Sequence, residues 1–309
     1  MNDDVLKNYH LDIVRVTETA AISAANWVGR GNKEEADRSA TENMRERLNS
    51  IDFSAEIAIG EGVKDDSYGL FEGEKVGLYR EEKEPSFEIA VDPIEGTTPT
   101  AKGGYEAMSV LALGFKNCFY KTPHFYMNKI AVGPRISKKV KVSLENSITT
   151  NVSLVAAALQ KDIQRVTVCC LDRPRHDGIV QELRGLGCRV KFISDCDVSA
   201  CIACCQFGSG IDMYLGIGGS PEAVISAAAM KCLGGYLQCQ EWDYNQNIYM
   251  PNLLEIEDLA QGPVIFCGTG ITDGKLLKGV TFENSPVTHT IAMRSSSGTV
   301  RYIETHHGN

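Results

Sequence analysis

The segment VDPIEGTT (residues 91–98) carries two carboxylates and a hydroxyl at the end of an apolar, strand-like run. Asp92 and Glu95 are separated by a proline and an isoleucine, and a tight turn held by the proline would let both carboxylates face one point. Gly96 has no side chain, so the backbone there can approach a ligand closely. Thr97 adds a hydroxyl that can orient a water molecule. These residues predict a site that binds its ligand through oxygen atoms.

Two further acids follow strand-like segments elsewhere in the chain. Glu61 comes just after the apolar run 56–59, and Glu222 follows the run 212–217 through a pair of glycines. In open α/β folds, ligands gather outside the carboxyl ends of the strands. Mg²⁺ and Mn²⁺ prefer carboxylate oxygens, and several acids at one point would repel one another without a cation. Each acid alone is also typical of a solvated loop or a helix cap, but together they predict a divalent-cation site.

The elements that must position these residues follow from the spacing of the apolar side chains. The sequence predicts helices over 10–28, 34–49, 151–160, 176–186 and 198–206, and one from about 221 to 233. It predicts strands over 56–59, 87–91, 107–115, 129–132, 165–171, 189–193 and 212–217, with β-rich segments at 263–268 and 289–304. The order strand, helix, strand over 165–193 is typical of a βαβ unit with parallel strands. We expect an α/β fold in two lobes that join near residue 150.

The composition limits the partners of this chain. Its 309 residues and 43% hydrophobic content suffice for a large core, and its net charge of -9 argues against nucleic-acid binding. A local basic pocket or a bound cation would still admit a small phosphorylated substrate. No apolar run approaches ~18 residues, and residues 1–14 lack the apolar core of a signal peptide, so we expect a cytoplasmic protein without a membrane partner. The 11 cysteines lack zinc-site spacing, which favours reduced, buried thiols.

The segment VDPIEGTT resembles the D-P-x-[DE]-G-[ST] signature of the lithium-sensitive, metal-dependent sugar and inositol phosphatases. Other segments, in the same order, are similar to those of class II fructose-1,6-bisphosphatases: GRGNKEEAD (29–37), IAIGEG (57–62), FYMNKIAVGP (125–134), LDRPRHD (171–177), ISDCDVSA (193–200), GIGGSPE (216–222) and GTGITDGKLLKGV (268–280). The resemblance runs from about residue 10 to the C-terminus. It implies a layered α-β-α-β-α sandwich of two packed lobes, one that binds metal (1–150) and one that binds sugar phosphate (151–309). An alternative in which the last strands return to the first lobe stays open.

The resemblance also implies a role for individual residues. Mg²⁺ or Mn²⁺ would be held by Asp37, Glu61, Asp92, Glu95 and Glu222, of which Asp37 would otherwise be assigned to a solvated helix face. The implied catalytic residues are Thr97, Glu61 and Asp92. The implied substrate contacts are Glu95, Gly96, Thr97, Tyr126, Arg173, Pro174, Arg175, Asp195, Cys196, Asp197 and Gly219. The implied reaction removes the 1-phosphate of fructose 1,6-bisphosphate by direct attack of a metal-bound water, in a homo-oligomer that is a dimer or a tetramer.

Residues around the implied sugar site give independent expectations. Two guanidinium groups, Arg173 and Arg175, follow a predicted strand and suit phosphate oxygens, although a surface basic turn is the simpler alternative. His176 beside them is more typical of a hydrogen-bonded structural histidine. Asp195 and Asp197 could accept hydrogen bonds from sugar hydroxyls.

Departures from the family pattern leave alternatives open. Cys196 stands where the family usually has glycine, and a positive φ there would strain the turn. The segment between Gly235 and Asp258 is shorter than is common in the family. Sedoheptulose 1,7-bisphosphate therefore remains an alternative or additional substrate, and a non-catalytic sugar-phosphate sensor is an alternative of another class. All the implied metal ligands and Thr97 are intact, which favours the enzyme.

Overall fold

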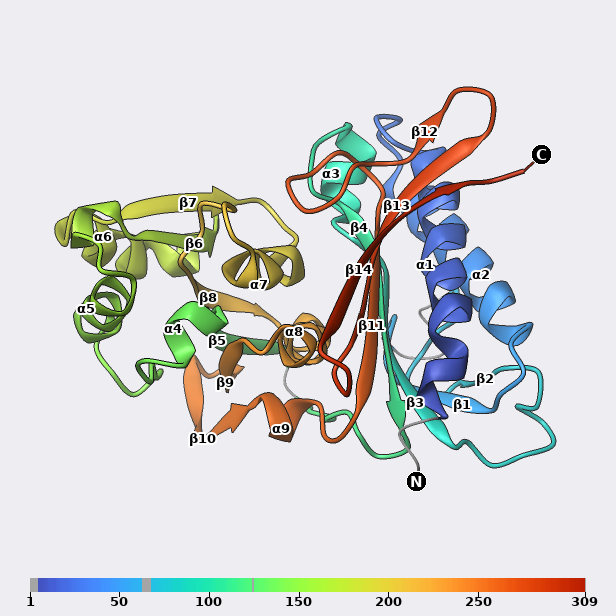
Figure 1. Ribbon diagram of the computed structural model, residues 1–309, viewed down its shortest axis with the longest axis horizontal. Helices are drawn as coiled ribbons and strands as arrows, with labels where there is room; N and C mark the ends of the chain where they lie inside the picture. The colour runs from blue at the N-terminus through green and yellow to red at the C-terminus, as the bar shows by residue number, and fades with distance from the viewer. Residues whose placement is uncertain (1–4, 63–67, 124, 309) are drawn as a thin grey trace. The chain divides into compact units, whose positions relative to one another are not determined.

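The computed structural model describes residues 5–62, 68–123 and 125–308 (Figure 1). The chain divides into two units, one formed by Met1–Lys121 with Ala260–Asn309 and the other by Thr122–Leu259. The units therefore do not divide near residue 150 as expected, and the last strands belong to the first unit, as the alternative prediction allowed. The physical reason is strand pairing, because strand β5 (Tyr126–Val132) already belongs to the second sheet and strand β11 (Val264–Gly270) belongs to the first.

The first unit is built on an eight-stranded sheet of order β12-β13-β11-β4-β3-β1-β2, with β14 paired to β13. Its elements are a 3-10 turn (Leu6–Tyr9), α1 (His10–Ala25), α2 (Lys33–Asn49), β1 (Ala55–Ile59), β2 (Lys75–Val76), β3 (Phe87–Glu95), α3 (Thr97–Lys102), β4 (Met108–Phe115), β11 (Val264–Gly270), β12 (Thr281–Phe282), β13 (Pro286–Arg294) and β14 (Thr299–His306). The apolar stripes predicted for α1 and α2 are confirmed, because Val16, Ala20, Met44 and Leu48 are all buried in the core. These helices lie beside the sheet, as Figure 1 shows.

The second unit contains a six-stranded sheet of order β10-β9-β5-β8-β6-β7. Its elements are β5 (Tyr126–Val132), α4 (Pro134–Ser137), α5 (Ile148–Leu159), β6 (Thr167–Leu171), α6 (Asp177–Gly185), β7 (Arg189–Ile193), α7 (Asp197–Cys205), β8 (Met213–Gly219), α8 (Ser220–Leu233), β9 (Tyr236–Asp243), β10 (Ile248–Glu255) and α9 (Ile256–Leu259), with 3-10 turns at Ile163–Arg165 and Pro174–His176. Strands β6 and β7 pair in parallel around α6, which confirms the predicted βαβ unit. The α/β fold class is also confirmed, since both units combine a multistranded sheet with helices.

Two elements of the candidate site differ from their sequence-based predictions. Strand β3 was expected to end at Asp92, but it continues to Glu95, and its pairing with β4 shifts register between these two acids. Such a bulge bends a strand and re-aims its side chains, so the sheet itself shapes the carboxylate segment. The short helix α3 then starts at Thr97, after Gly96 in the left-handed region with φ 102°.

The cysteine side chains test one further prediction. All 11 cysteines are in the thiol form, and all but Cys205 are buried, which agrees with the prediction of reduced apolar side chains. Within the described residues, no helix is both long enough and apolar enough to span a lipid bilayer.

Candidate active site

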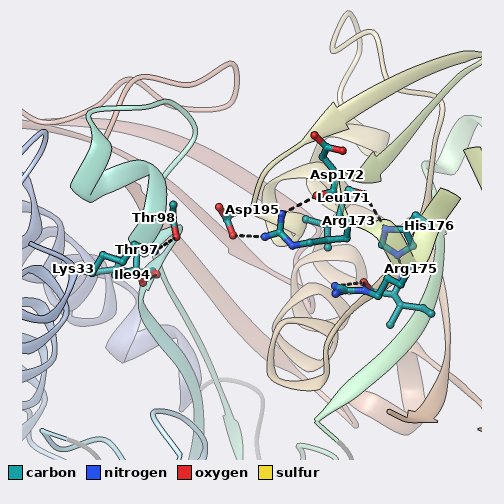
Figure 2. Close-up of polar contacts among 11 residues, drawn as sticks. Lys33, Ile94, Thr97, Thr98, Leu171, Asp172, Arg173, Arg175, His176 and Asp195 are labelled. Atoms are coloured by element: carbon teal, nitrogen blue, oxygen red, sulfur yellow. Dashed lines mark hydrogen bonds and ion pairs between the residues drawn. The ribbon is translucent and has the colours of Figure 1, made fainter. Parts of the chain in front are cut away.

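The bulge of β3 places the predicted carboxylates and hydroxyl on one short turn of the first unit. Asp92 Oδ1 accepts a hydrogen bond from the backbone N–H of Ile94 at 3.0 Å. Thr97 Oγ1 donates to the carbonyl of Ile94 at 3.4 Å (Figure 2). The Asp92 and Thr97 side chains therefore both fold back on the same residue. Glu95 is buried, whereas Asp92 and Thr97 are partly exposed. The turn therefore fixes one carboxylate inside the unit and keeps a carboxylate and a hydroxyl accessible.

Neighbouring elements bring two more of the predicted acids toward this turn. Strand β1 pairs with β3 in parallel, so the segment after β1, which carries Glu61, leaves the sheet at the same edge as Asp92. Lys33 in the first turn of α2 donates to Thr98 Oγ1 at 2.7 Å, which ties α2 to α3 (Figure 2). Asp37 lies one helical turn after Lys33 on the same face, and burial raises the pKa of its carboxyl.

These acids lie on adjoining elements without forming a compact cluster. Across residues 5–62, 68–123 and 125–308, no group of three or more His, Cys, Asp or Glu side chains could hold a metal ion as it stands. The fifth predicted ligand, Glu222, belongs to the second unit. The metal-ligand set therefore stays a prediction.

Glu222 provides the test of whether this chain suits a bound cation. Its Oε2 atom is buried, and no described residue forms a hydrogen bond with it. A Cβ atom on Gly219 would lie 1.9 Å from Oε2, so only glycine permits the carboxylate to occupy this place. Burial, followed by the charge of Asp197, raises the pKa of Glu222, while Lys129 opposes the shift. A buried carboxylate oxygen of this kind requires a partner, and an oxygen ligand suits Mg²⁺ or Mn²⁺.

Arg173 and Arg175, the predicted phosphate contacts, both form hydrogen bonds within the second unit, as Figure 2 shows. Arg173 donates through Nη2 to Asp195 Oδ1 at 3.0 Å and through Nη1 to the carbonyl of Asp172 at 2.9 Å. Arg175 donates through Nε and Nη2 to the carbonyl of Ile217, at 3.1 and 2.8 Å. These contacts use part of each guanidinium and hold the remaining N–H groups in fixed directions.

Tyr126 and Gly219 extend the same region. They are opposite each other in the β5–β8 ladder, and the Arg175 guanidinium lies over the Tyr126 ring at 5.2 Å from its centroid. Pro174 opens the 3-10 turn between the two arginines. The structure therefore brings the predicted contacts Tyr126, Arg175 and Gly219 together within the second unit.

His176 is a structural residue, as the sequence predicted. It is fully buried, its Nδ1 lies 2.8 Å from the carbonyl of Leu171, and its Nε2 accepts the backbone N–H of Ile217 at 2.7 Å (Figure 2). These partners require the neutral tautomer that carries its proton on Nδ1. Burial is the main cause that lowers the pKa of His176.

Residues 195–197 form a turn, named the acid turn below, in which protein groups already bind both carboxylates. Cys196 has φ 69° and ψ 50°, so the left-handed backbone that would strain a side chain is present. Asp197 is only 4% exposed, and its Oδ2 accepts from Lys129 Nζ at 2.7 Å and from Tyr214 Oη at 3.2 Å. Each carboxylate therefore already has a protein partner through one of its oxygens. The sugar contacts of Asp195 and Asp197 stay predictions.

Sequence reasoning missed Lys129. It is fully buried in β5, within a run otherwise read as an apolar strand. Burial lowers the pKa of its ammonium, but the attraction of Asp197 and Glu222 outweighs this, and the pKa lies above its ordinary value. A single lysine inside an apolar strand is the one signal in the sequence that points to this pair, because a buried charge requires a partner.

Comparison with known proteins places the chain in a family. Residues 7–307 match the family model described as bacterial fructose-1,6-bisphosphatase, glpX-encoded. Two relatives, each named D-fructose 1,6-bisphosphatase class 2/sedoheptulose 1,7-bisphosphatase, come from Synechocystis sp. and Crocosphaera subtropica. Each is 39% identical over 336 residues, which cover 96% of this chain and 95% of the relative. A third relative, from Acaryochloris marina, has the same name followed by the number 1. It is 39% identical over 331 residues, which cover 96% of this chain and 95% of the relative.

A solved structure also matches part of the chain. An extragenic suppressor from Pyrococcus furiosus covers 64% of this chain and 70% of its own, at 11% sequence identity and a TM-score of 0.34. The family model and the relatives, by contrast, extend over nearly the whole sequence. The chain therefore belongs to the glpX-type bacterial fructose-1,6-bisphosphatases, a family of metal-dependent phosphoric monoester hydrolases.

Proposed function

We propose that this chain hydrolyses the 1-phosphate of fructose 1,6-bisphosphate to give fructose 6-phosphate and inorganic phosphate, with a divalent cation as cofactor. The observation that carries the proposal is the turn of β3 and α3, where Asp92, Glu95 and Thr97 stand within a chain that matches the family throughout. The arginines and Tyr126 of the second unit supply groups that suit a phosphate and a sugar.

The residues proposed to hold Mg²⁺ or Mn²⁺ are Asp37, Glu61, Asp92, Glu95 and Glu222. A bound cation would lower the pKa of a water molecule and neutralise the charge that develops on the phosphoryl oxygens. Thr97 lies one residue after the left-handed Gly96, and its hydroxyl is held by the carbonyl of Ile94. In the proposed mechanism this hydroxyl orients the attacking water, with Glu61 and Asp92 as the other catalytic residues. Gly96 leaves room for the phosphate.

In the proposed mechanism, hydrogen-bond donors and one aromatic ring bind the substrate. We propose that Arg173 and Arg175 bind phosphate oxygens through the N–H groups that form no hydrogen bond with Asp195, Asp172 or Ile217. Tyr126 provides an aromatic face and a hydroxyl for the sugar, and Gly219 precedes the N-terminus of α8, whose free N–H groups favour an anion. Glu95, Gly96, Pro174 and the acid turn complete the proposed contact set.

Sedoheptulose 1,7-bisphosphate is the second candidate substrate, because the relatives carry both activities in their names. The experiment measures phosphate release by the purified protein from fructose 1,6-bisphosphate, sedoheptulose 1,7-bisphosphate and inositol 1-phosphate. Turnover of fructose 1,6-bisphosphate to fructose 6-phosphate is expected. Faster turnover of sedoheptulose 1,7-bisphosphate would make that sugar the preferred substrate. Turnover of none of the three, with sugar-phosphate binding retained, would favour a non-catalytic sensor.

We also propose a cytoplasmic setting and a homo-oligomer. The 11 cysteines are all thiols, which suits a reducing compartment, because disulfides form and persist mainly in oxidising ones. A symmetric dimer or tetramer is the proposed assembly. Light scattering coupled to size-exclusion chromatography measures it directly, and a monomer mass would reject it.

A further inference from the structure

The acid turn is held from both ends. At its start, Asp195 accepts the Arg173 guanidinium at 3.0 Å, and this pair is partly exposed. At its end, Asp197 Oδ2 accepts both the Lys129 ammonium and the Tyr214 hydroxyl, and all three side chains are buried. Between them, Cys196 adopts a left-handed conformation that side chains other than glycine seldom take. A strained turn of this kind persists only when its surroundings fix it.

The buried end of the turn is closely fitted. A Cβ atom on Gly218 would lie 2.0 Å from Asp197 Oδ2 and 3.0 Å from Lys129 Nζ, so the strand backbone packs directly against the ion pair. Lys129 and Tyr214 come from β5 and β8, which pair with each other in the sheet. Both reach the same carboxylate oxygen from rigid elements, which limits the positions that Asp197 can take.

We propose that Lys129 and Tyr214 are positioning residues that keep the acid turn in the shape required for sugar binding, against the conformational preference of Cys196. The inference rests on the proposed function, since the acid turn belongs to the proposed sugar contacts. It assigns to Asp197 a new role, in which one oxygen anchors the turn to the sheet. Neither residue needs to touch the substrate.

The test compares Tyr214→Phe, Lys129→Met, Cys196→Gly and the double variants that combine Cys196→Gly with each of the first two. Tyr214→Phe removes one hydroxyl and keeps the ion pair, so it remains informative if Lys129→Met does not fold. Lys161→Met is the matched control, because Lys161 pairs at 2.6 Å with Asp212, another buried aspartate of the second unit. It lies outside the proposed site.

Steady-state kinetics with fructose 1,6-bisphosphate and Mn²⁺ should separate positioning from general stability. Tyr214→Phe is expected to raise KM about tenfold with a smaller change in kcat, in the range found when supporting contacts of a site are removed. Lys129→Met should raise KM further, whereas Lys161→Met should lower Tm and leave KM unchanged. The double variant Tyr214→Phe/Cys196→Gly should have a KM close to that of the wild type, because glycine takes the left-handed conformation without support.

The inference is overturned if Tyr214→Phe and Lys129→Met keep the wild-type KM and differ from the wild type only in Tm, as the control does. It is also overturned if Cys196→Gly restores nothing. Thermal unfolding gives a second reading that needs no substrate. The loss of Tm caused by Tyr214→Phe should be smaller in the Cys196→Gly background, and equal losses in both backgrounds would contradict the inference. A wild-type protein inactive on every sugar bisphosphate would reject the proposed function, while this unfolding comparison would still decide the inference.

Discussion

At the scale of the residue, a hydrogen bond or a φ angle decides what each side chain can contribute. The sequence suggests that Asp195 and Asp197 are two equivalent acceptors, yet one pairs with a partly exposed guanidinium and the other with a buried ammonium. The difference matters because removing one partner of a buried ion pair strongly destabilises the folded protein. A pair at the surface, by contrast, contributes only about 0–1 kcal/mol to stability. The two ends of the acid turn therefore differ in their tolerance of substitution.

Cys196 gives the first prediction, which concerns backbone strain. Replacement by glycine and by alanine removes the same buried thiol, but only glycine adopts φ 69° without strain. Cys196→Gly is expected to be more stable than Cys196→Ala by about 1 kcal/mol, the reverse of the usual order of these residues. Urea unfolding of both variants measures the difference. Equal stabilities, or a more stable alanine variant, would show that the turn stores no strain.

Thr97 gives a second prediction at this scale. Thr97→Ala removes the hydroxyl that Ile94 orients, so kcat should fall about 100-fold, within the range for a positioned proton-transfer group. The neighbouring Thr98, which accepts from Lys33, serves for comparison, and Thr98→Ala should lose less than tenfold. Calorimetry should find Mn²⁺ binding retained in Thr97→Ala. A near-normal kcat would remove Thr97 from its proposed role.

At the scale of the element, local pattern predicted most helices and strands, because periodicity reports which face is buried. It predicted α1, α2 and the βαβ unit of β6 and β7, whose apolar stripes are continuous. It did not predict the hairpin of β9 and β10, where Asp243 accepts two turn N–H groups within a polar stretch. It also ended β3 too early, since a bulge depends on the neighbouring strand rather than on the residues themselves.

The hydrogen bond between His176 and the backbone of β8 leads to a pH prediction. The pKa of His176 is lowered in the folded protein, so its stabilising contribution is complete above the ordinary pKa of about 6.5 and is lost as the pH falls below it. The free energy of unfolding should fall more steeply between pH 6.5 and 5 in the wild type than in His176→Asn. Parallel curves for the two proteins would reject this role.

At the scale of the whole molecule, the sequence did not indicate where the chain passes from the first unit to the second and back again. Strand β5 reads as an apolar strand in either sheet, and only its pairing with β8 and β9 assigns it to the second. The same holds for Lys129, whose partner Asp197 lies far along the chain. Long-range pairing of this kind leaves no local pattern. The family segments, by contrast, were readable because each is a short run of adjacent residues.

The proposed cofactor gives a prediction that does not depend on turnover. A cation that binds only the folded protein stabilises it by about 2.7 kcal/mol at 100 times its Kd. Mn²⁺ should therefore raise the Tm of the wild type, and Glu222→Gln should require roughly 10–100-fold more Mn²⁺ for the same rise. Glu257→Gln, which alters an exposed acid of α9, should behave as the wild type does. Identical titrations for all three would remove Glu222 from the proposed ligands.

The most direct test of the central claim is phosphate release from fructose 1,6-bisphosphate before and after removal of divalent cations. Purified protein is treated with EDTA, exchanged into metal-free buffer and then titrated with Mn²⁺ or Mg²⁺. A metal-dependent sugar bisphosphatase should lose its activity in EDTA and regain it with added cation, with fructose 6-phosphate as the product. Full activity in the presence of EDTA would contradict the metal mechanism, and a lack of turnover at every cation concentration would contradict the proposed reaction.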